Sequence, residues 1–132
     1  KAEKALELMV KRAFTLEAFG KPIAKVGKNL EVISRARIEI DAMRLYVLQA
    51  AKAMDVLGNK EARVYISAVK AMVPEKACLI VDQAIQMHGA AGISQWTPLA
   101  GMSTDMRHLR FADGPDEVHR RTVARMELAK YS

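Results

Sequence analysis

Residues 82–125 decide the fold, and they read DQAIQMHGAAGISQWTPLAGMSTDMRHLRFADGPDEVHRRTVAR. The stretch begins inside a helical pattern, in which apolar residues recur every three or four positions. Residues 89–97 then form a glycine-containing loop, and Pro98 suits the first position of a short helix. A second proline, Pro115, suits the first position of a final helix. The stretch therefore predicts a long helix, a loop, a short helix and a last helix, in that order.

The same spacing of apolar residues predicts three longer helices in the rest of the chain. The first covers about 1–18 and the second about 28–57, with a connector at 19–27 between them. We expect the second helix to end at Gly58, because glycine takes the left-handed conformation that commonly closes a helix. The third helix covers about 60–87.

Two prolines bear on the remaining boundaries. We expect Pro74 to kink the third helix or to start a fresh segment, because proline removes one backbone donor and clashes with the preceding turn. The short helix runs from Pro98 to about 110, and the last helix runs from 115 to the end. With no repeat or internal linker, residues 1–132 are predicted to form one all-α domain, an up-down four-helix bundle with an additional short helix.

The net charge of +6 is compatible with nucleic acid, an anionic membrane or the phosphates of a cofactor. The basic residues are spread among acidic ones without interleaved aromatic residues, so a mixed-charge surface is favoured over nucleic acid or a membrane. No apolar run approaches the roughly 20 residues of a membrane span, and no signal peptide is recognisable. Because the chain begins at Lys1 inside a helical pattern, we expect it to be a piece of a longer protein.

The single cysteine, Cys78, excludes an intramolecular disulfide and is typical of a reducing, intracellular compartment. Cytoplasm, mitochondrion and peroxisome are equally compatible with it. Its neighbours are apolar, which predicts a buried and unreactive thiol. The histidines, His88, His108 and His119, have no metal-ligand spacing with one another or with Cys78, so no metal site is expected.

The segment from Asp113 to Glu117 allows two interpretations. Acidic residues around a proline are typical of a helix start, where they cap the backbone and face the positive end of the helix dipole, and residue chemistry alone favours this capping role for Asp113. Alternatively, Asp113 lies in a largely apolar cleft as a general base that accepts a proton from carbon.

The order of these segments closely resembles the C-terminal helical domain of the flavin-dependent acyl-CoA dehydrogenases. In that family an acid followed by glycine, usually a glutamate, removes the α-proton of an acyl-CoA thioester while a hydride leaves the β-carbon for the flavin. The resemblance implies that Asp113 is the catalytic base and that Gly114 lines the thioester. The run ADGPDEVH at 112–119 is similar to the subgroup that includes the kinase-fused acyl-CoA dehydrogenases, in which aspartate replaces glutamate.

The resemblance also implies contacts with FAD. Residues 86–92 resemble the family's Gln-x-x-Gly-Gly-x-Gly segment, which meets FAD, commonly its adenosine part across a subunit interface. Further FAD contacts lie just beyond the base. The implied cofactor-binding residues are Gln86, Met87, His88, Gly89, Ala90, Pro115, Asp116 and Glu117. The family further implies a homodimer or homotetramer, and an electron-transfer flavoprotein as a candidate electron acceptor.

Several positions depart from the family pattern. Residues 19–22 resemble its Arg-x-x-Phe-Gly-Lys segment, but Leu16 occupies the place of the arginine that reaches the FAD pyrophosphate. Arg12, one turn earlier, is a candidate substitute or an ordinary surface arginine. Leu16, Ala90, Pro115 and Glu117 favour an alternative function, a non-catalytic helical assembly module derived from this family. Asp113 and the intact segment order favour the enzyme.

Overall fold

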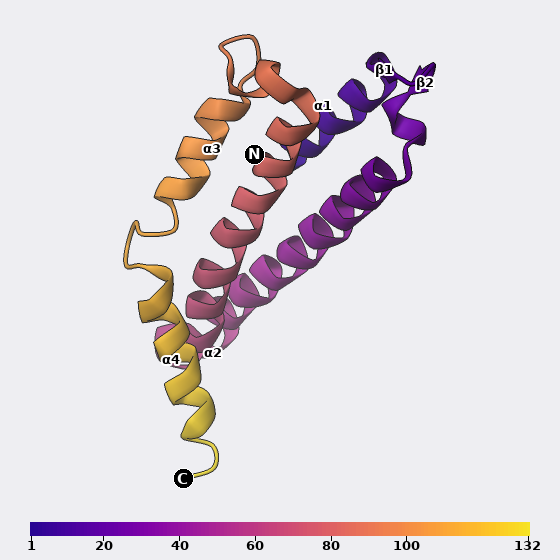
Figure 1. Ribbon diagram of the computed structural model, residues 1–132. Helices are drawn as coiled ribbons and strands as arrows, with labels where there is room; N and C mark the ends of the chain where they lie inside the picture. Colours follow the sequence, from indigo (N-terminus) through magenta and orange to yellow (C-terminus); the bar gives the residue numbers. More distant parts are fainter.

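The computed structural model describes residues 1–132 as an elongated set of packed helices with one small hairpin (Figure 1). The elements are α1 (Ala2–Thr15), β1 (Glu17–Ala18), β2 (Lys21–Pro22), the 3₁₀ helix η1 (Ile23–Lys25), α2 (Gly27–His88), the 3₁₀ helix η2 (Gly89–Ile93), α3 (Leu99–His108) and α4 (Asp116–Leu128). The predicted all-α class is confirmed. None of the helices combines the length and apolar character that a membrane crossing requires.

Gly58 divides α2 into two arms, and this confirms the predicted helix boundary. Its backbone angles, φ 77° and ψ 175°, are not helical, and they reverse the direction of the chain. We call residues 27–57 the first arm and residues 59–88 the second arm. In Figure 1, α1 and the first arm run in opposite directions, the second arm returns beside the first, and α3 and α4 descend along the second arm. The up-down order is therefore as predicted, with α3 as the additional short helix.

Pro74 does not start a fresh segment, so of the two expected outcomes, a kink or a fresh segment, the second was wrong. The only non-helical backbone angles inside α2 are those of Gly58, and Pro74 is buried in the middle of the second arm. The second arm packs against the first arm, α3 and α4 along its length. Most of the stability of a helix in a protein comes from such packing, which here holds the helix across one missing hydrogen bond.

The predicted connector after α1 contains a β-hairpin that the sequence pattern did not reveal. Glu17 pairs with Pro22, and Ala18 pairs with Lys21, in antiparallel register. The two residues at the turn, Phe19 and Gly20, have φ angles of 55° and 74°. Positive φ at both central residues is typical of the type I′ turn, whose twist matches that of the flanking strands. As a result α1 ends at Thr15, three residues before the predicted end at 18.

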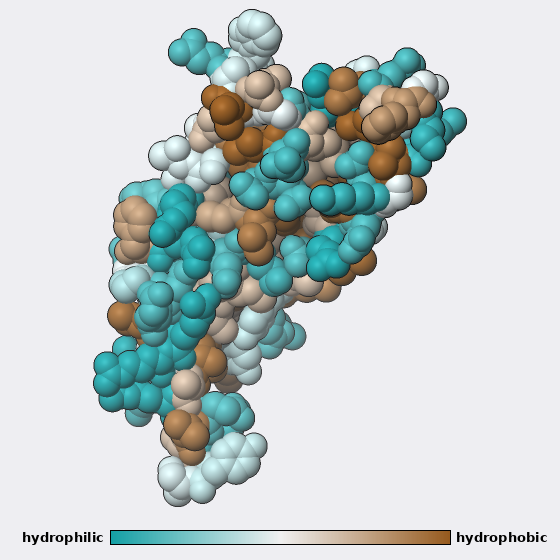
Figure 2. Space-filling view, in the orientation of Figure 1, coloured by the Kyte–Doolittle hydropathy of each residue, from teal (hydrophilic) through white to brown (hydrophobic).

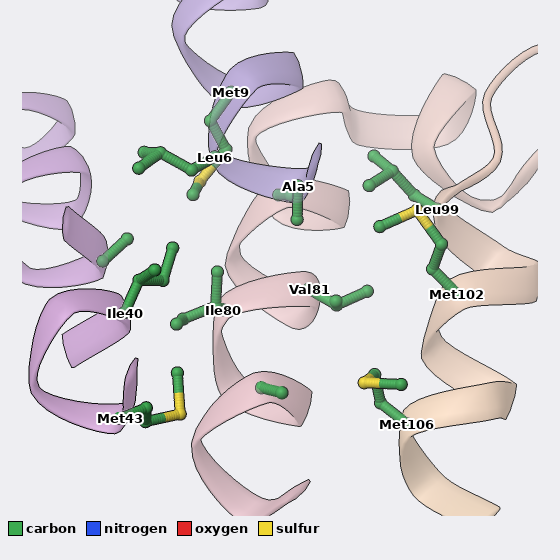
Figure 3. Close-up of a cluster of buried hydrophobic side chains, with 13 residues drawn as sticks. Ala5, Leu6, Met9, Ile40, Met43, Ile80, Val81, Leu99, Met102 and Met106 are labelled. Carbon is green, nitrogen blue, oxygen red and sulfur yellow. The ribbon is translucent and has the colours of Figure 1, made fainter. Parts of the chain in front are cut away.

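The hydrophobic core joins α1, both arms of α2 and α3 (Figure 3). Its small residues let the helices approach closely, and its methionines fill the space between them. The core consists of Ala5, Leu6, Met9, Ala36, Ile40, Met43, Ala77, Ile80, Val81, Ala84, Leu99, Met102 and Met106. None of these residues lies on α4. The last helix is therefore held to the second arm by contacts outside the main core, and these contacts also shape the loop before it.

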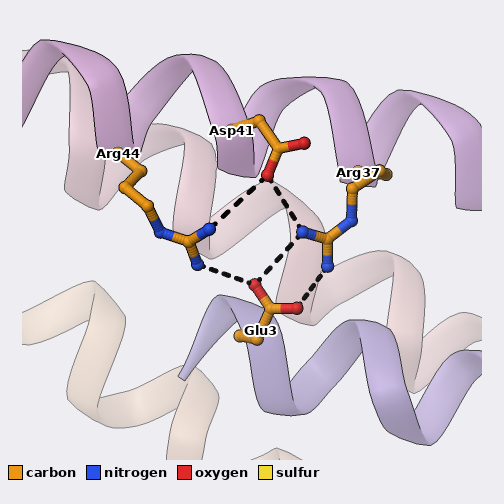
Figure 4. A network of polar contacts seen from close by, with 4 residues as sticks. All are labelled: Glu3, Arg37, Asp41 and Arg44. Carbon is orange, nitrogen blue, oxygen red and sulfur yellow. Dashed lines mark hydrogen bonds and ion pairs between the residues drawn. The ribbon is translucent and has the colours of Figure 1, made fainter.

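A polar network ties α1 to the first arm (Figure 4). Glu3 accepts hydrogen bonds from Arg37 and Arg44, and Asp41 accepts another from Arg37 at 3.0 Å. The hydrogen bond from Arg37 is the main cause of a lowered pKa of Glu3. Burial opposes it, and the charge of Arg37 and the contacts of Arg44 lower the pKa further. These side chains are largely solvated, so the network fixes the register of the two helices more than it stabilises the fold.

Candidate active site and cofactor contacts

The loop at residues 109–115 connects α3 to α4 and carries Asp113; we call it the Asp113 loop. Asp113 has φ 56° and Gly114 has φ 102°, so two successive residues take left-handed backbone conformations. Aspartate is one of the few residues with a side chain that adopts this conformation with some frequency. The side chain of Asp113 is exposed and makes no hydrogen bond or ion pair within this chain. Its carboxylate therefore projects freely from a sharply turned backbone.

The capping interpretation of Asp113 was wrong. The residue at the N-cap position of α4 is Pro115, and no side chain makes a capping hydrogen bond there. Two acids, Asp116 and Glu117, occupy the first turn of α4 and face the positive end of its dipole. These residues fulfil the electrostatic role that the capping interpretation gave to Asp113. The apolar cleft that the base interpretation requires is not formed by this chain alone, because Asp113 is exposed in it.

Asp116 is engaged in an ion pair inside the chain. It is only 3% exposed, its Oδ2 accepts a hydrogen bond from Arg110 Nε at 2.7 Å, and Nη2 of the same guanidinium forms an ion pair with Oδ2 at 2.7 Å. The hydrogen bond from Asp116 raises the pKa of Arg110. The other carboxylate oxygen, Oδ1, is buried without a partner in this chain. This oxygen is closed to solvent in the chain as described.

The segment at residues 86–92 forms an exposed corner where the second arm meets η2. Gln86, Gly89 and Ala90 are exposed, while Met87 and His88 are half-buried. His88 is oriented by a contact of 2.8 Å between its Nδ1 and the main-chain oxygen of Ala84. Open space surrounds Gly89, so a ligand can approach the backbone there. These residues fit the FAD contacts that the family resemblance implies.

Gly92, unlike Gly89, is required by close packing inside the chain. A Cβ added to Gly92 would lie 2.6 Å from the main-chain oxygen of Ile85, on the last turns of the second arm. No carbon can approach an oxygen so closely, so the absence of a side chain lets η2 fold back onto α2. The glycine at this position therefore has a structural explanation that needs no cofactor.

We expect Gly92→Ala to lower the free energy of unfolding by about 1–3 kcal/mol, the usual cost of overpacking a close contact. Gly101→Ala is the matched control, because nothing lies within 4 Å of a Cβ at that helical position. Alanine is favoured over glycine in helices by roughly 1 kcal/mol, so the control is expected to unfold at a higher urea concentration than the parent. Equal effects of the two substitutions would contradict the packing explanation for Gly92.

The two groups of expected cofactor contacts lie at opposite ends of α3. Residues 86–90 precede the helix and residues 115–117 follow it, as Figure 1 shows. The ten residues of α3 span about 15 Å at 1.5 Å per residue. The structure therefore does not bring the two groups into one small pocket.

One departure from the family pattern, Leu16, lies directly before the hairpin. Leu16 follows the last turn of α1, and its main-chain oxygen accepts a hydrogen bond from Ile23 N at 2.9 Å. Arg12 is half-buried one turn earlier, and its Nε is buried without a partner in this chain. Arg12 thus has an unused donor. Phe19, at the tip of the hairpin, is 96% exposed.

The remaining titratable candidates stay apart from one another. No three His, Cys, Asp or Glu side chains gather as the ligands of a metal would. Cys78 is half-buried rather than buried, and burial raises the pKa of its thiol against the weaker opposing effects of Arg110 and Arg107. A raised pKa disfavours the thiolate, which is the reactive form of cysteine.

Residues 1–128 match the family described as "Acyl-CoA dehydrogenase, C-terminal domain". The chain belongs to the acyl-CoA dehydrogenase family. One similar member is acyl-CoA dehydrogenase family member 10 of Mus musculus, with 51% identity over 131 residues. The alignment covers 99% of this chain and 12% of the mouse protein. The fold and the family expected from the sequence are therefore confirmed.

Two solved structures contain a domain that matches this chain over about a third of their length. The first is a protein from Mycobacterium abscessus that is assigned to the acyl-CoA dehydrogenases. It matches with a TM-score of 0.97 and 48% identity, and the match covers 99% of this chain and 32% of that chain. Butyryl-CoA dehydrogenase from Megasphaera elsdenii matches with a TM-score of 0.88 and 25% identity over 96% of this chain and 33% of that chain. This chain thus spans about a third of these solved acyl-CoA dehydrogenases.

Proposed function

We propose that this domain supplies the catalytic base of a FAD-dependent acyl-CoA dehydrogenase and part of its oligomer interface. The base is Asp113, and the substrate is an acyl-CoA thioester that is oxidised between its α- and β-carbons. One observation carries the proposal. In the Asp113 loop, a carboxylate free of hydrogen bonds projects from a left-handed backbone, a conformation that is unfavourable for a residue with a side chain and is often retained at functional sites.

The proposed reaction assigns one task to each group. Asp113 accepts the α-proton, and the electron pair of that C–H bond becomes the new double bond. FAD, when bound, supplies the acceptor for the hydride that leaves the β-carbon. In the proposed complex, Gly114 lines the thioester. The protonated Asp113 then returns its proton to solvent. Residues 86–90 would hold FAD at the exposed corner, with Pro115, Asp116 and Glu117 beside the base.

Exposed apolar side chains support the oligomer interface. On the first arm, Ile38, Leu45 and Val56 recur at a spacing that places them on one side of the helix, and all three are exposed. Figure 2 shows further apolar surface at the end that carries the β1–β2 hairpin, among hydrophilic residues on the rest of that face. Exposed apolar side chains that gather on one side of a helix are typical of protein contacts. The same surface also favours the alternative, an assembly module without redox chemistry.

Experiments on a longer protein that contains this domain distinguish the two candidate functions. We expect it to purify with stoichiometric FAD and to be bleached under anaerobic conditions by at least one of a short-, a medium- and a long-chain acyl-CoA. The isolated chain is expected to fold as a helical oligomer and to reduce no dye, because one domain lacks most of the flavin environment. Circular dichroism, sizing chromatography and flavin absorbance measure these properties. A longer protein that forms the same oligomer but neither binds FAD nor reacts with acyl-CoA would instead establish the assembly module.

A further inference from the structure

We propose that Lys70 and His119 are positioning residues that hold the backbone of Asp113 and so aim its carboxylate. This inference rests on the proposed function of Asp113 as the base. Two successive main-chain oxygens of the Asp113 loop are held from different helices. Lys70 Nζ, on the second arm, donates to Gly114 O at 2.7 Å, and His119 Nε2, on α4, lies 3.1 Å from Asp113 O. Each contact thus joins the loop to a helix that the core or the second arm fixes in place.

The loop needs such support because of its backbone conformation. Asp113 has φ 56°, which is unfavourable for a residue with a side chain and persists only where the surroundings determine it. The contact from Lys70 is assisted by the charge of its ammonium group, and such hydrogen bonds are roughly twice as strong as neutral ones. Without the two donors, water would satisfy both oxygens and the peptide planes would be free to turn. The carboxylate would then lose its fixed direction.

His119 is itself oriented by Ser67. The Nδ1 of His119 lies 3.4 Å from the hydroxyl oxygen of Ser67, which is only 5% exposed. Because Nε2 faces an oxygen that can only accept, Nε2 carries the hydrogen, and Nδ1 is free to accept from Ser67. A Cβ added to Gly114 would lie 3.2 Å from His119 Nε2, so glycine at that position leaves room for the imidazole. The arrangement places Ser67, His119 and the Asp113 backbone in one chain of contacts.

Both contacts to the Asp113 loop are made to its main chain, and the carboxylate of Asp113 stays free. Asp116, only three residues later, shows the opposite arrangement, because its carboxylate is neutralised by Arg110. The same short segment therefore contains one acid held by its side chain and one acid held by its backbone. Holding the backbone fixes the direction of a base without occupying the oxygens that must receive the proton.

The test replaces each donor in the longer, FAD-containing protein and measures the rate of flavin reduction by acyl-CoA. We expect Lys70→Met and His119→Leu each to slow reduction by about tenfold to a hundredfold, because misplacing a catalytic group by 1 Å can cost that much. The KM for acyl-CoA and the FAD content should stay within about twofold of the parent values. With α-deuterated substrate the isotope effect should increase, because proton removal becomes more strongly rate-limiting.

Three further variants complete the test. Lys52→Met is the matched control, since Lys52 is exposed and makes no hydrogen bond or ion pair, and it should reduce at the parent rate. His119→Gln should recover most of the rate lost in His119→Leu, because an amide can donate to the same oxygen. Asp113→Asn serves as the reference for a lost base. If Lys70→Met fails to fold, the reduction rates of His119→Leu and His119→Gln are enough to test the positioning role.

Three results would overturn the proposal. The first is flavin reduction at the parent rate in both Lys70→Met and His119→Leu, while Asp113→Asn is slow. This result would show that the base needs no such support. The second is that His119→Leu and His119→Gln both lose reduction rate, bound FAD and thermal stability. His119 would then have a structural role only. If Asp113→Asn itself reduces at the parent rate, the proposed function fails, and the positioning role fails with it.

Discussion

Replacing Asp113 by asparagine in the longer protein is expected to slow flavin reduction by acyl-CoA about 10²–10⁴-fold, the typical loss when a general base is removed. The amide cannot accept the α-proton. Asparagine tolerates the left-handed backbone about as well as aspartate, so φ 56° at this position is retained. Lys70 and His119 bind main-chain oxygens, and both contacts survive the substitution. The folded structure should therefore be unchanged.

Anaerobic stopped-flow absorbance measures this rate, alongside FAD content and the thermal midpoint of unfolding. Asp116→Asn provides a contrast from the same segment. It removes the charge that Arg110 pairs with in a nearly buried site, and losing one partner of such a pair is destabilising. We expect a lower midpoint for Asp116→Asn and an unchanged midpoint for Asp113→Asn. Normal reduction by Asp113→Asn would remove the residue from the mechanism.

The largest effect on stability is expected at Leu99. Leu99→Ala should lower the free energy of unfolding by about 2–5 kcal/mol, because it removes buried methyl groups and leaves a cavity. Leu99 is the first residue of α3 and is 0% exposed within the core that joins α3 to α1 and both arms of α2. Loss of this contact would loosen α3, which connects the exposed corner at 86–92 to the Asp113 loop.

Urea denaturation followed by circular dichroism measures the change. Leu128→Ala is the matched control, because Leu128 is 69% exposed at the end of α4 and should change stability by no more than about 0.5 kcal/mol. A loss below about 1 kcal/mol for Leu99→Ala would mean that α3 contributes little to the core.

The helices could be predicted because most of them bury one apolar face, and that face appears in the sequence as a spacing of three or four. Gly58 could also be predicted as a break, since glycine favours the backbone angles found there. Pro74 could not be judged from its local chemistry, because packing on both sides of the second arm maintains the helix. The hairpin at residues 17–22 depends on Phe19 taking a positive φ, which few residues other than glycine do.

The candidate site was only partly accessible from the sequence. Asp113 and residues 86–90 could be selected because they lie in short segments with a recognisable order. Lys70 is 44 positions from Gly114 in the chain, and a lysine on a helix is ordinarily a solvated surface residue, so no local pattern indicates its contact. The ion pair of Asp116 with Arg110 was likewise missed, because it requires the turn between α3 and α4 to bring the two side chains together.

The position of Asp113 relative to a bound substrate tests the central claim most directly. We would determine a crystal structure of the longer protein with FAD and an unreactive acyl-CoA analogue. A carboxylate oxygen of Asp113 is predicted to lie about 3–3.5 Å from the α-carbon, the separation of groups poised to react. A carboxylate that faces solvent, with a different acid against the α-carbon, would contradict the account.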